Sequence, residues 1–406
     1  MSAASFDFTA PGRILFGPGR AVEAGPALAQ LLSSYPASGG SAVPPGPSEA
    51  ETRILLVSGG DPARLEGIRA SLKSAKLESV EFAIKREPRF DDARSALALA
   101  RESGCRAVVG FGGGSALDLA KAVAALLANP GDPLDYAEVI GGGRALSAAS
   151  IPCVAIPTTA GTGSEATRNA VLASEERRVK VSLRSPTMVP ALAVVDPLLC
   201  LSLPPRPTAD TGMDALTQVI EPYVCVSPNS LVDALCLEAI SRIQRSLPQV
   251  YRDGADAEAR LDLSWASLAG GLALANARLG AVHGLAGPLG GLLPVPHGAA
   301  CAALLAPTTA ANVAALRSRA PDHPALDRYA RVAALLRRGR SSGPEDAAPA
   351  LAELAARLDV RSLREFGLQL TDLDAVSVAA EAASSMRGNP IRLERAELLG
   401  ILEAAY

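Results

Sequence analysis

The hydrophobic pattern in the first half of the chain alternates between short apolar runs and longer stretches of helical period. Apolar runs at Arg53–Val57 and Ala107–Phe111 are typical of buried strands, and a further strand is expected near Val80–Ile84. Between the second and third of these strands in chain order, Asp91–Ser103 shows the spacing of a helix. Strands that alternate with helices of this length predict a parallel, doubly wound α/β sheet.

The pattern changes after Asp196-Pro197. From Thr208 onward nearly every segment has helical spacing, and no convincing strand is found. Three prolines in Leu201–Pro207 (LSLPPRP) are expected to stop both strand and helix. The sequence therefore predicts an α/β domain over residues 1–202 and an all-helical domain over residues 203–406.

Three segments are expected to be irregular. The segment Pro36–Thr52 is rich in Gly, Pro and Ser and is interpreted as a surface insertion within the first domain. Within the helical half, Arg337–Pro349 and Ser384–Leu393 are expected to be loops.

Composition places the chain among ordinary globular proteins. Its 406 residues, 49% hydrophobic and 20% charged, suffice for two domains with large cores. A net charge of -3 without a sustained basic run indicates neither nucleic acid nor an anionic membrane as a partner. The N-terminus has no apolar signal core, so a cytoplasmic location is expected. The six cysteines are scattered without a CxxC pair and indicate neither a disulfide framework nor a cysteine–zinc site.

Candidate chemistry is concentrated in residues 276–305, which contain two of the three histidines, His283 and His297. Each lies among small apolar residues, and a neutral imidazole there is a good ligand for zinc or ferrous iron. The nearest anionic partner is Asp214, which shares a helix face with Gln218 four residues later. Taken singly, each histidine is more often a hydrogen-bonded core residue, and Asp214 a helix cap.

A second candidate site is the glycine-rich turn in AVVGFGGGSALDLAKAVAALL. A buried strand ends at Phe111, and Ser115 is expected to cap a helix that runs to about Leu127. The bare amides of a helix N-terminus bind anions, so a pyrophosphate is expected over Gly112, Gly113, Gly114 and Ser115. The turn does not match GxGxxG, and a single strand–GGGS–helix turn is also common without a ligand.

Taken together, these motifs resemble the iron-dependent (class III) alcohol dehydrogenase family. DALTQ, HGLAGPLG and PHGAACAALLAP are similar to the family pattern DAxxH … HGxxHPLG … PHG, and GGGSALDLAK and PTTAGTGSE to GGGSxxDxAK and PTTxGTGSE. The resemblance implies the dehydroquinate synthase-like fold, with a nucleotide-binding domain followed by a helical metal and substrate domain. It also implies an NAD(P)-dependent oxidoreductase that interconverts an alcohol and an aldehyde or ketone.

The resemblance implies a divalent metal, Fe²⁺ or Zn²⁺, held by Asp214, His283 and His297, which would also be the catalytic residues. The chain departs from the family pattern at two positions. The third metal histidine of the family is Gln218 here, a weaker oxygen donor, and the second histidine of HGxxH is Gly287. The related glycerol dehydrogenases resemble this chain in using one Asp and two His.

For the cofactor, the resemblance implies contacts from the glycine-rich turn and from further residues that match the family motifs by position: Asp118, Thr158, Thr159, Thr162, Ser164 and Lys180. An acidic residue that selects NAD is replaced by Gly59, which favours NADP with Arg64 in reach, whereas the neighbouring Asp61 favours NAD. NAD or NADP is therefore expected.

Three alternatives stay open. One is a metal-free enzyme resembling maleylacetate reductases, and a second is a non-redox lyase resembling dehydroquinate synthases, for which Arg278 is almost the only cation in the motif segments. The third is a non-catalytic binding protein. The expected partners are a small alcohol or carbonyl substrate and a second copy of the chain in a homodimer, without nucleic acid or membrane.

Overall fold

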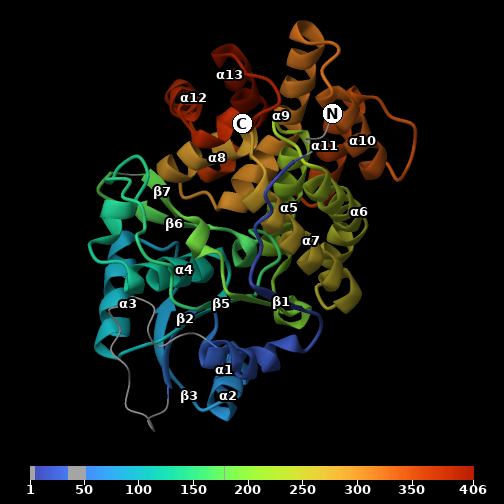
Figure 1. Ribbon diagram of the computed structural model, residues 1–406. Helices are drawn as coiled ribbons and strands as arrows, with labels where there is room; N and C mark the ends of the chain where they lie inside the picture. Colours follow the sequence, from blue (N-terminus) through green and yellow to red (C-terminus); the bar gives the residue numbers. More distant parts are fainter. Residues whose placement is uncertain (1–4, 35–51, 178) are drawn as a thin grey trace. The chain divides into compact units, whose positions relative to one another are not determined.

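The computed structural model describes residues 5–34, 52–177 and 179–406 (Figure 1). The chain divides into two compact units. The first, the sheet unit, contains Thr9–Thr159 and Gly163–Cys200; the second, the helical unit, contains Leu201–Tyr406 with residues 5–8 and Ala160–Thr162. The surface insertion expected at Pro36–Thr52 lies, except for Thr52, outside the described residues.

The sheet unit is built on six parallel strands in the order β1-β8-β5-β4-β2-β3. Their bounds are β1 Arg13–Phe16, β2 Thr52–Gly59, β3 Leu77–Ile84, β4 Val108–Gly112, β5 Cys153–Pro157 and β8 Leu192–Val195. The prediction of a parallel α/β sheet is confirmed. The three strands expected from the apolar runs are β2, β3 and β4.

Helices cover both faces of the sheet (Figure 1). On one face lie α3 (Phe90–Glu102) and α4 (Gly114–Ala128), which pack against Leu55 and Val57 of β2. On the other lie α1 (Ala24–Ser34) and α2 (Glu66–Ser74), which pack against residues such as Ile54 and Leu56. Successive strand residues thus face opposite cores, so β2 reads as one continuous apolar run.

A two-stranded antiparallel sheet of β6 (Asn169–Ser174) and β7 (Val179–Arg184) was not predicted. Its apolar side chains join the core of α3 and α4, with Ala170 and Leu172 fully buried. The segment is short and mixed in polarity, so its period-2 signal is weak. Short 3₁₀ helices complete this unit: η1 Arg20–Glu23, η2 Pro62–Leu65, η3 Pro133–Tyr136, η4 Ser164–Ala166, η5 Pro186–Met188 and η6 Pro197–Cys200.

The helical unit contains no strand within its described residues, as expected. Its helices are α5 Pro205–Val224, α6 Ser230–Arg252, α7 Ala257–Asn276, α8 Ala281–Leu292, α9 His297–Arg319, α10 Ala325–Leu336, α11 Ala347–Arg357, α12 Leu373–Glu381 and α13 Arg395–Ala404. The 3₁₀ helices are η7 Pro344–Asp346, η8 Leu363–Phe366, η9 Leu370–Asp372 and η10 Ser384–Gly388. The expected loops are the connections around η7 and η10.

The prolines of LSLPPRP have a different role from the one expected. Pro205 begins α5, and Pro207 lies in its first turn, where a missing N–H costs no intrahelical bond. These prolines therefore start a helix as well as end the preceding segment.

The helix α9 is long and apolar enough to span a membrane by length and composition, yet 72% of its most apolar window is buried inside the structure. It is one of the core helices of its unit, and its burial accounts for its hydropathy.

Candidate active site

One face of α5 carries three polar side chains into the interior of the helical unit. Asp214, Gln218 and Glu221 are spaced four and three residues apart, and all are buried. This spacing puts them on the same side of the helix, one above another. The sequence predicts the first two of these residues and misses the third.

The two histidines approach Asp214 from α8 and α9. His283 is the third residue of α8, and His297 is the first residue of α9. A glycine follows each histidine, and at Gly298 its role is clear: a Cβ there would lie 2.4 Å from the carbonyl oxygen of Asp210. The absence of a side chain thus lets the start of α9 pack directly on α5 and brings His297 to Asp214.

The structure brings Asp214, His283 and His297 together, and adds Cys301 to them. Asp214 Oδ1 lies 3.7 Å from His283 Nε2 and 3.9 Å from His297 Nε2. Donor atoms of these four residues all lie within 4.8 Å of one another, so they could hold a metal ion. The side chains of Asp214 and His283 are buried, whereas that of His297 is 42% exposed.

Asp214 Oδ1 is a buried carboxylate oxygen with no hydrogen-bond partner among the described residues. An unpaired buried carboxylate is costly unless a cation compensates it. Two imidazole nitrogens and one carboxylate are also the donor set of many open zinc sites. The residues present therefore fit a divalent cation at this position.

Glu221 orients His283 from the side opposite Asp214. Its Oε2 lies 2.6 Å from His283 Nδ1, and its Oε1 accepts a hydrogen bond of 2.7 Å from the backbone N–H of Val282. A proton on Nδ1 leaves the lone pair of Nε2 directed to Asp214 and available to a metal. The sequence signal for Glu221 is its i+7 spacing from Asp214.

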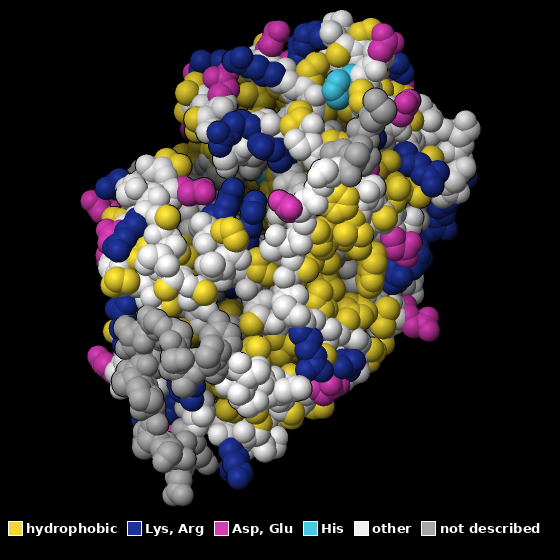
Figure 2. Space-filling view, viewed as in Figure 1, with side chains coloured by type: hydrophobic (Ala, Val, Ile, Leu, Met, Phe, Trp, Pro, Cys, Tyr) yellow, Lys and Arg dark blue, Asp and Glu magenta, His cyan; other side chains and the backbone are white. Residues whose placement is uncertain are grey.

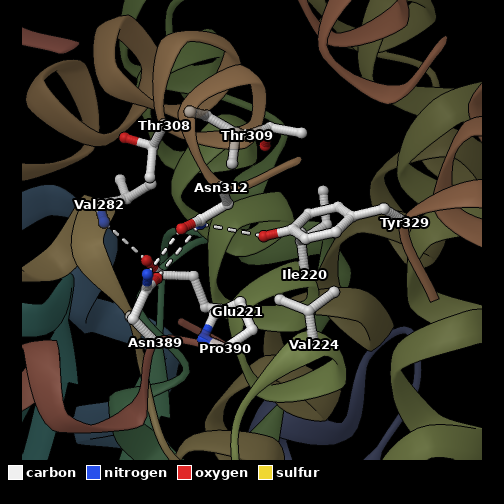
Figure 3. A pocket seen from close by; sticks show the side chains of 12 residues that line it. Ile220, Glu221, Val224, Val282, Thr308, Thr309, Asn312, Tyr329, Asn389 and Pro390 are labelled. Atoms are coloured by element: carbon white, nitrogen blue, oxygen red, sulfur yellow. Dashed lines mark hydrogen bonds between the residues drawn. The ribbon is translucent and has the colours of Figure 1, made fainter. Parts of the chain in front are cut away.

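Glu221 in turn belongs to a buried polar network around a small cavity of about 10 Å³ (Figure 3). The side chains of Asn312 and Asn389 hydrogen-bond each other, and Asn312 also donates to the hydroxyl of Tyr329. Asn389 Oδ1 accepts from the backbone N–H of Ala281 at the start of α8. This network fixes the N-terminal turn of α8 and with it the position of His283.

The electrostatics of the cluster call for positive charge. Burial lowers the pKa of His283, but the charges of Glu221 and Asp214 outweigh burial and raise that pKa to about 10. Burial raises the pKa of Asp214, but the two histidines outweigh this and lower it. The carboxylates thus attract either a proton on His283 or a metal cation in its place.

Gln218 has a defined orientation. Its amide nitrogen donates to the backbone oxygens of Thr162 at 3.0 Å and Gly161 at 3.4 Å. The amide oxygen Oε1 is buried and has no hydrogen-bond partner among the described residues. The acceptor end of Gln218 is therefore the end left for a cation, although its contact with a metal stays a prediction.

The two remaining positions near the site behave differently. A Cβ on Gly287 would meet no atom within 4 Å, so the position has room for a side chain that this chain lacks. Cys301 lies one helical turn after His297, and its Sγ is 3.7 Å from His297 Nε2. Burial, followed by the charges of Asp214 and Glu221, raises the pKa of its thiol. The sequence offered only the i+4 spacing as a signal for Cys301.

In the sheet unit, the glycine-rich turn connects β4 to α4. The helix begins at Gly114, its N-cap is Gly113, and no side chain caps it. The prediction that Ser115 is the cap is therefore wrong, because Ser115 already lies inside the first turn. The first amides of α4 have no intrahelical partner and no capping side chain, which suits an anion.

The turn lies where the strand order reverses. From β2 the chain goes first to β3 on one side and then to β4 on the other. In doubly wound sheets, ligands bind outside the carboxyl ends of the strands at such a switch point.

Gly112 ends β4 with φ +152°, and a Cβ there would lie 3.1 Å from the backbone nitrogen of Gly59, the last residue of β2. The two strand ends approach closely because both residues are glycine.

Other expected cofactor residues lie on the next loop of the sheet unit. The backbone of Thr158 donates to Gly112, and Thr159 is near Gly113, where a Cβ would be 3.4 Å from its methyl group. Ser164 donates to Asp118 at 2.5 Å. The other Asp118 oxygen accepts from the backbone of Val171, and Asp118 also pairs with buried Lys121.

These contacts make Asp118 a link between α4, the loop and β6. Lys180, on β7, pairs with Glu87 at 2.6 Å, and Thr162 lies in the segment that hydrogen-bonds Gln218. The structure thus brings Thr158, Thr159 and Asp118 around the turn, while cofactor contact by any of them stays a prediction.

The residues near Gly59 are already engaged. Asp61 accepts from the backbone of Ala63 and caps η2, and Arg64 donates to the carbonyl oxygen of Leu199. Neither side chain is reserved for a ribose or a phosphate, so the preference between NAD and NADP stays open.

Comparison with known proteins agrees with this architecture. Residues 42–197 match the family described as "Iron-containing alcohol dehydrogenase", and residues 208–406 match "Fe-containing alcohol dehydrogenase family, C-terminal". The chain is 31% identical to a 1,3-propanediol dehydrogenase of Klebsiella pneumoniae, with 100% of both chains covered. It is 36% identical to alcohol dehydrogenase 4 of Saccharomyces cerevisiae over 79% of this chain and 81% of that protein.

Solved structures give the same result. The crystal structure of a 1,3-propanediol oxidoreductase superposes with a TM-score of 0.87 at 31% identity and covers 99% of this chain and 100% of its own. An alcohol dehydrogenase from Oenococcus oeni superposes with a TM-score of 0.85 at 28% identity, with coverage of 99% and 100%.

A parallel sheet with a glycine-rich turn at its switch point, together with a helical unit that presents an Asp/His cluster, defines a class of nucleotide- and metal-dependent oxidoreductases. The chain belongs to the iron-containing alcohol dehydrogenase family. It is an enzyme of alcohol–carbonyl interconversion, and the predicted family, fold class and activity are confirmed. The comparisons give no support to the maleylacetate reductase-like or dehydroquinate synthase-like alternatives.

Proposed function

We propose that the chain catalyses NAD(P)-dependent, metal-assisted hydride transfer between an alcohol and an aldehyde or ketone, with the ion held by Asp214, His283 and His297 and with Gln218 at its edge. The observation that carries the proposal is Asp214 Oδ1, a buried oxygen without a hydrogen-bond partner among the described residues, less than 4 Å from two imidazole nitrogens.

When bound, the nicotinamide supplies or accepts the hydride, and a divalent ion acts as a Lewis acid on the substrate oxygen. The chain's own residues hold and orient these groups. Glu221 keeps the proton of His283 on Nδ1 and thereby presents Nε2 to the cation. The apolar residues around α8 and α9 limit water near the reacting carbonyl.

The turn from Gly112 to Ser115 would hold the cofactor pyrophosphate through its backbone amides. Thr158, Thr159, Thr162 and Ser164 would add hydroxyl groups, Asp118 would hold the loop in place, and Lys180 would lie near the ribose. Support for this assignment comes from the switch-point position of the turn and from the uncapped start of α4.

Proton transfer needs a route that does not involve residue 287, because glycine carries no titratable group. Water or a cofactor ribose hydroxyl would take this role. The open space around Gly287 is consistent with such a route.

For the substrate, we propose short primary alcohols and diols and the matching aldehydes. This rests on relatives that are named alcohol dehydrogenase and 1,3-propanediol dehydrogenase, the latter similar over its full length. We further propose that the enzyme is a cytoplasmic homodimer. Figure 2 shows Lys and Arg side chains interspersed with Asp and Glu on the face in view, which does not favour a polyanionic partner.

The test is oxidation of NADH or NADPH with a panel of aldehydes, measured on metal-stripped protein and after addition of zinc or ferrous salts. Activity should depend on the added ion and be lost in His283→Ala and His297→Ala. The third histidine, His323, lies outside the cluster, so His323→Ala is the matched control and should keep activity. Equal activity with and without metal would refute the proposed site and favour metal-free catalysis.

A further inference from the structure

Cys301 is a buried, potentially metal-ligating side chain to which the proposed function gives no role. It lies on α9, and its donor atom belongs to the same group as those of Asp214, His283 and His297. The scattered cysteines gave no indication of a metal site in the sequence, because no second cysteine is near Cys301 along the chain.

The separations of the donor atoms suit a single ion with four ligands. With metal–nitrogen bonds of about 2.0 Å and metal–sulfur bonds of about 2.3 Å, the donors of a tetrahedral site lie roughly 3.3–3.6 Å apart. Cys301 Sγ lies 3.7 Å from His297 Nε2, and Asp214 Oδ1 lies 3.7 Å from His283 Nε2. For these two pairs, a contraction of a few tenths of an ångström would reach coordination distances, and all donor atoms of the group lie within 4.8 Å of one another. The substrate oxygen would then be a fifth ligand, since zinc sites can expand from four to five ligands.

Charge balance gives a second argument. Glu221 is engaged by His283 Nδ1 and Val282, so Asp214 is the one carboxylate of the cluster that faces the imidazole Nε2 atoms. Among the direct ligands, Asp214 alone supplies one negative charge to a divalent ion, whereas Asp214 and a thiolate together supply two. The unpaired Oδ1 of Asp214 shows independently that the cluster is arranged for a ligand.

Burial of a cysteine is not a sufficient explanation for this arrangement. Cys236 on α6 is equally buried, yet it belongs to no metal-type group among the described residues. Cys301 differs because it follows His297 by four residues, so both side chains leave the same face of α9.

We propose that Cys301 is the fourth protein ligand of the divalent ion, in place of the imidazole that Gln218 does not provide, and that it makes the site prefer zinc to ferrous iron. Coordination replaces the S–H bond by a metal–sulfur bond, and the proton leaves to solvent. Thiolate is a softer donor than an imidazole or an amide oxygen, and it favours zinc. The inference rests on the proposed function, because it requires an ion on Asp214, His283 and His297.

The experiment loads metal-stripped protein with Co²⁺ and records its absorption spectrum. Co²⁺ takes the same donors as zinc, and a bound thiolate gives an intense sulfur-to-cobalt charge-transfer band in the near ultraviolet. The proteins compared are wild type, Cys301→Ala, Cys301→Ser and the control Cys236→Ala. Zinc and ferrous affinities are measured in parallel by chelator competition.

Wild type and Cys236→Ala should show the band, and both Cys301 variants should bind cobalt without it. Zinc affinity should fall at least about tenfold in the Cys301 variants, and ferrous affinity should fall less. Cobalt bound by wild type without the band, or a band retained in a Cys301 variant, would overturn the inference and leave the proposed function intact. Failure of wild type to bind any divalent ion would overturn both.

Discussion

At the scale of single residues, Glu221 illustrates how a side chain that need not touch the proposed ion would control its binding. The carboxylate accepts two hydrogen bonds, one from His283 Nδ1–H and one from Val282 N–H. In Glu221→Gln, the amide oxygen can accept one of these hydrogen bonds. The NH₂ group is a donor and cannot accept the other. We expect metal affinity to fall about 10- to 100-fold in this variant.

The measurement is chelator competition with zinc on Glu221→Gln and wild type. A conservative control is Glu238→Gln, since Glu238 lies on α6 and its exposed carboxylate pairs with Arg242. An unchanged zinc affinity in Glu221→Gln would mean that His283 keeps its orientation without the carboxylate.

Gln218 gives a second prediction at this scale. An imidazole is a better donor to zinc and ferrous iron than a neutral amide oxygen, so Gln218→His should tighten the binding of both ions. Gly270 lets α7 pack closely against this position, because an added Cβ there would lie only 3.3 Å from Gln218 Cβ. The measurement is metal titration of the variant against wild type.

Gly287→His, added to Gln218→His, should make the reaction rate change with pH near neutrality. Position 287 has room for the side chain, and an imidazole gains or loses its proton near neutral pH. Equal or weaker metal affinity in Gln218→His would show that residue 218 does not face the ion, and its assignment to the site would be withdrawn.

The residues of the site differ in how well the sequence predicts them. Asp214, His283 and His297 were predicted as site residues because histidine is rare in the chain and because short motifs resemble those of a family, and the structure brings them together. Glu221 and Cys301 were missed, since Glu and Cys are ordinary in helices and their spacing acquires meaning only after α5, α8 and α9 are packed together. The engagement of Asp118 by Ser164 and Val171 was equally invisible, because these bonds span 46 and 53 residues.

At the scale of elements, the buried strands were predicted well from their hydrophobic pattern, whereas the cap of a helix was predicted wrongly from residue preference. The strands β2 and β4 are buried on both faces, so their apolar runs are unambiguous. The antiparallel pair of β6 and β7 has partly buried, mixed-polarity strands and was missed. The cap of α4 was assigned to Ser115 by residue preference, whereas the close approach of β2 and β4 makes glycine the residue that turns the chain there.

The turn before α4 gives a prediction in which neighbouring glycines behave differently. Gly113 has φ −76°, and a Cβ there would make ordinary contacts with Thr159, so Gly113→Val should fold. Its methyl groups would cover the amides that receive the pyrophosphate, so NADH and NADPH binding should fall below detection. Cofactor fluorescence titration measures the binding.

Gly112→Ala is the comparison for that turn. Gly112 has φ +152°, and its added Cβ would lie 2.9 Å from Ala116 Cβ, so this variant should be destabilised as a fold. Undiminished cofactor affinity in a folded Gly113→Val protein would remove the phosphate-binding assignment.

At the scale of the whole molecule, stability should depend on pH through a buried carboxyl group. Glu165 is fully buried, and burial raises its pKa to about 7 from an ordinary value near 4.5. The folded protein therefore holds a proton on Glu165 between these two values, and the unfolded chain does not. Stability from this group is present below pH 4.5, falls as pH rises, and is lost above about 7, a change of about 3 kcal/mol.

Glu165→Gln removes this titration and keeps the shape of the side chain. Relative to wild type, the unfolding free energy of the variant should therefore rise from pH 5 to pH 8. Denaturant midpoints at several pH values measure it, and pH-independent effects of the substitution cancel in the comparison. A difference that stays constant over this range would show that Glu165 titrates normally in the folded protein.

The two ligands should protect different parts of the molecule, because the proposed metal donors lie in the helical unit and the proposed cofactor turn lies in the sheet unit. A ligand stabilises the segments that bind it against local opening. In amide hydrogen exchange, zinc should slow α5, α8 and the start of α9, and NADPH or NADH should slow the turn after β4 and the start of α4. Each effect should appear without the other ligand.

Two variants make this test specific. His283→Ala should lose the protection given by zinc and keep that given by the cofactor, while Gly113→Val should do the reverse, since each removes one set of contacts only. Cofactor protection that requires zinc, or that disappears in His283→Ala, would show that the ion also shapes the nucleotide site. In that case, the assignment of separate binding groups to the two units would be wrong, and hydride transfer would depend on metal at the binding step as well as at the chemical step.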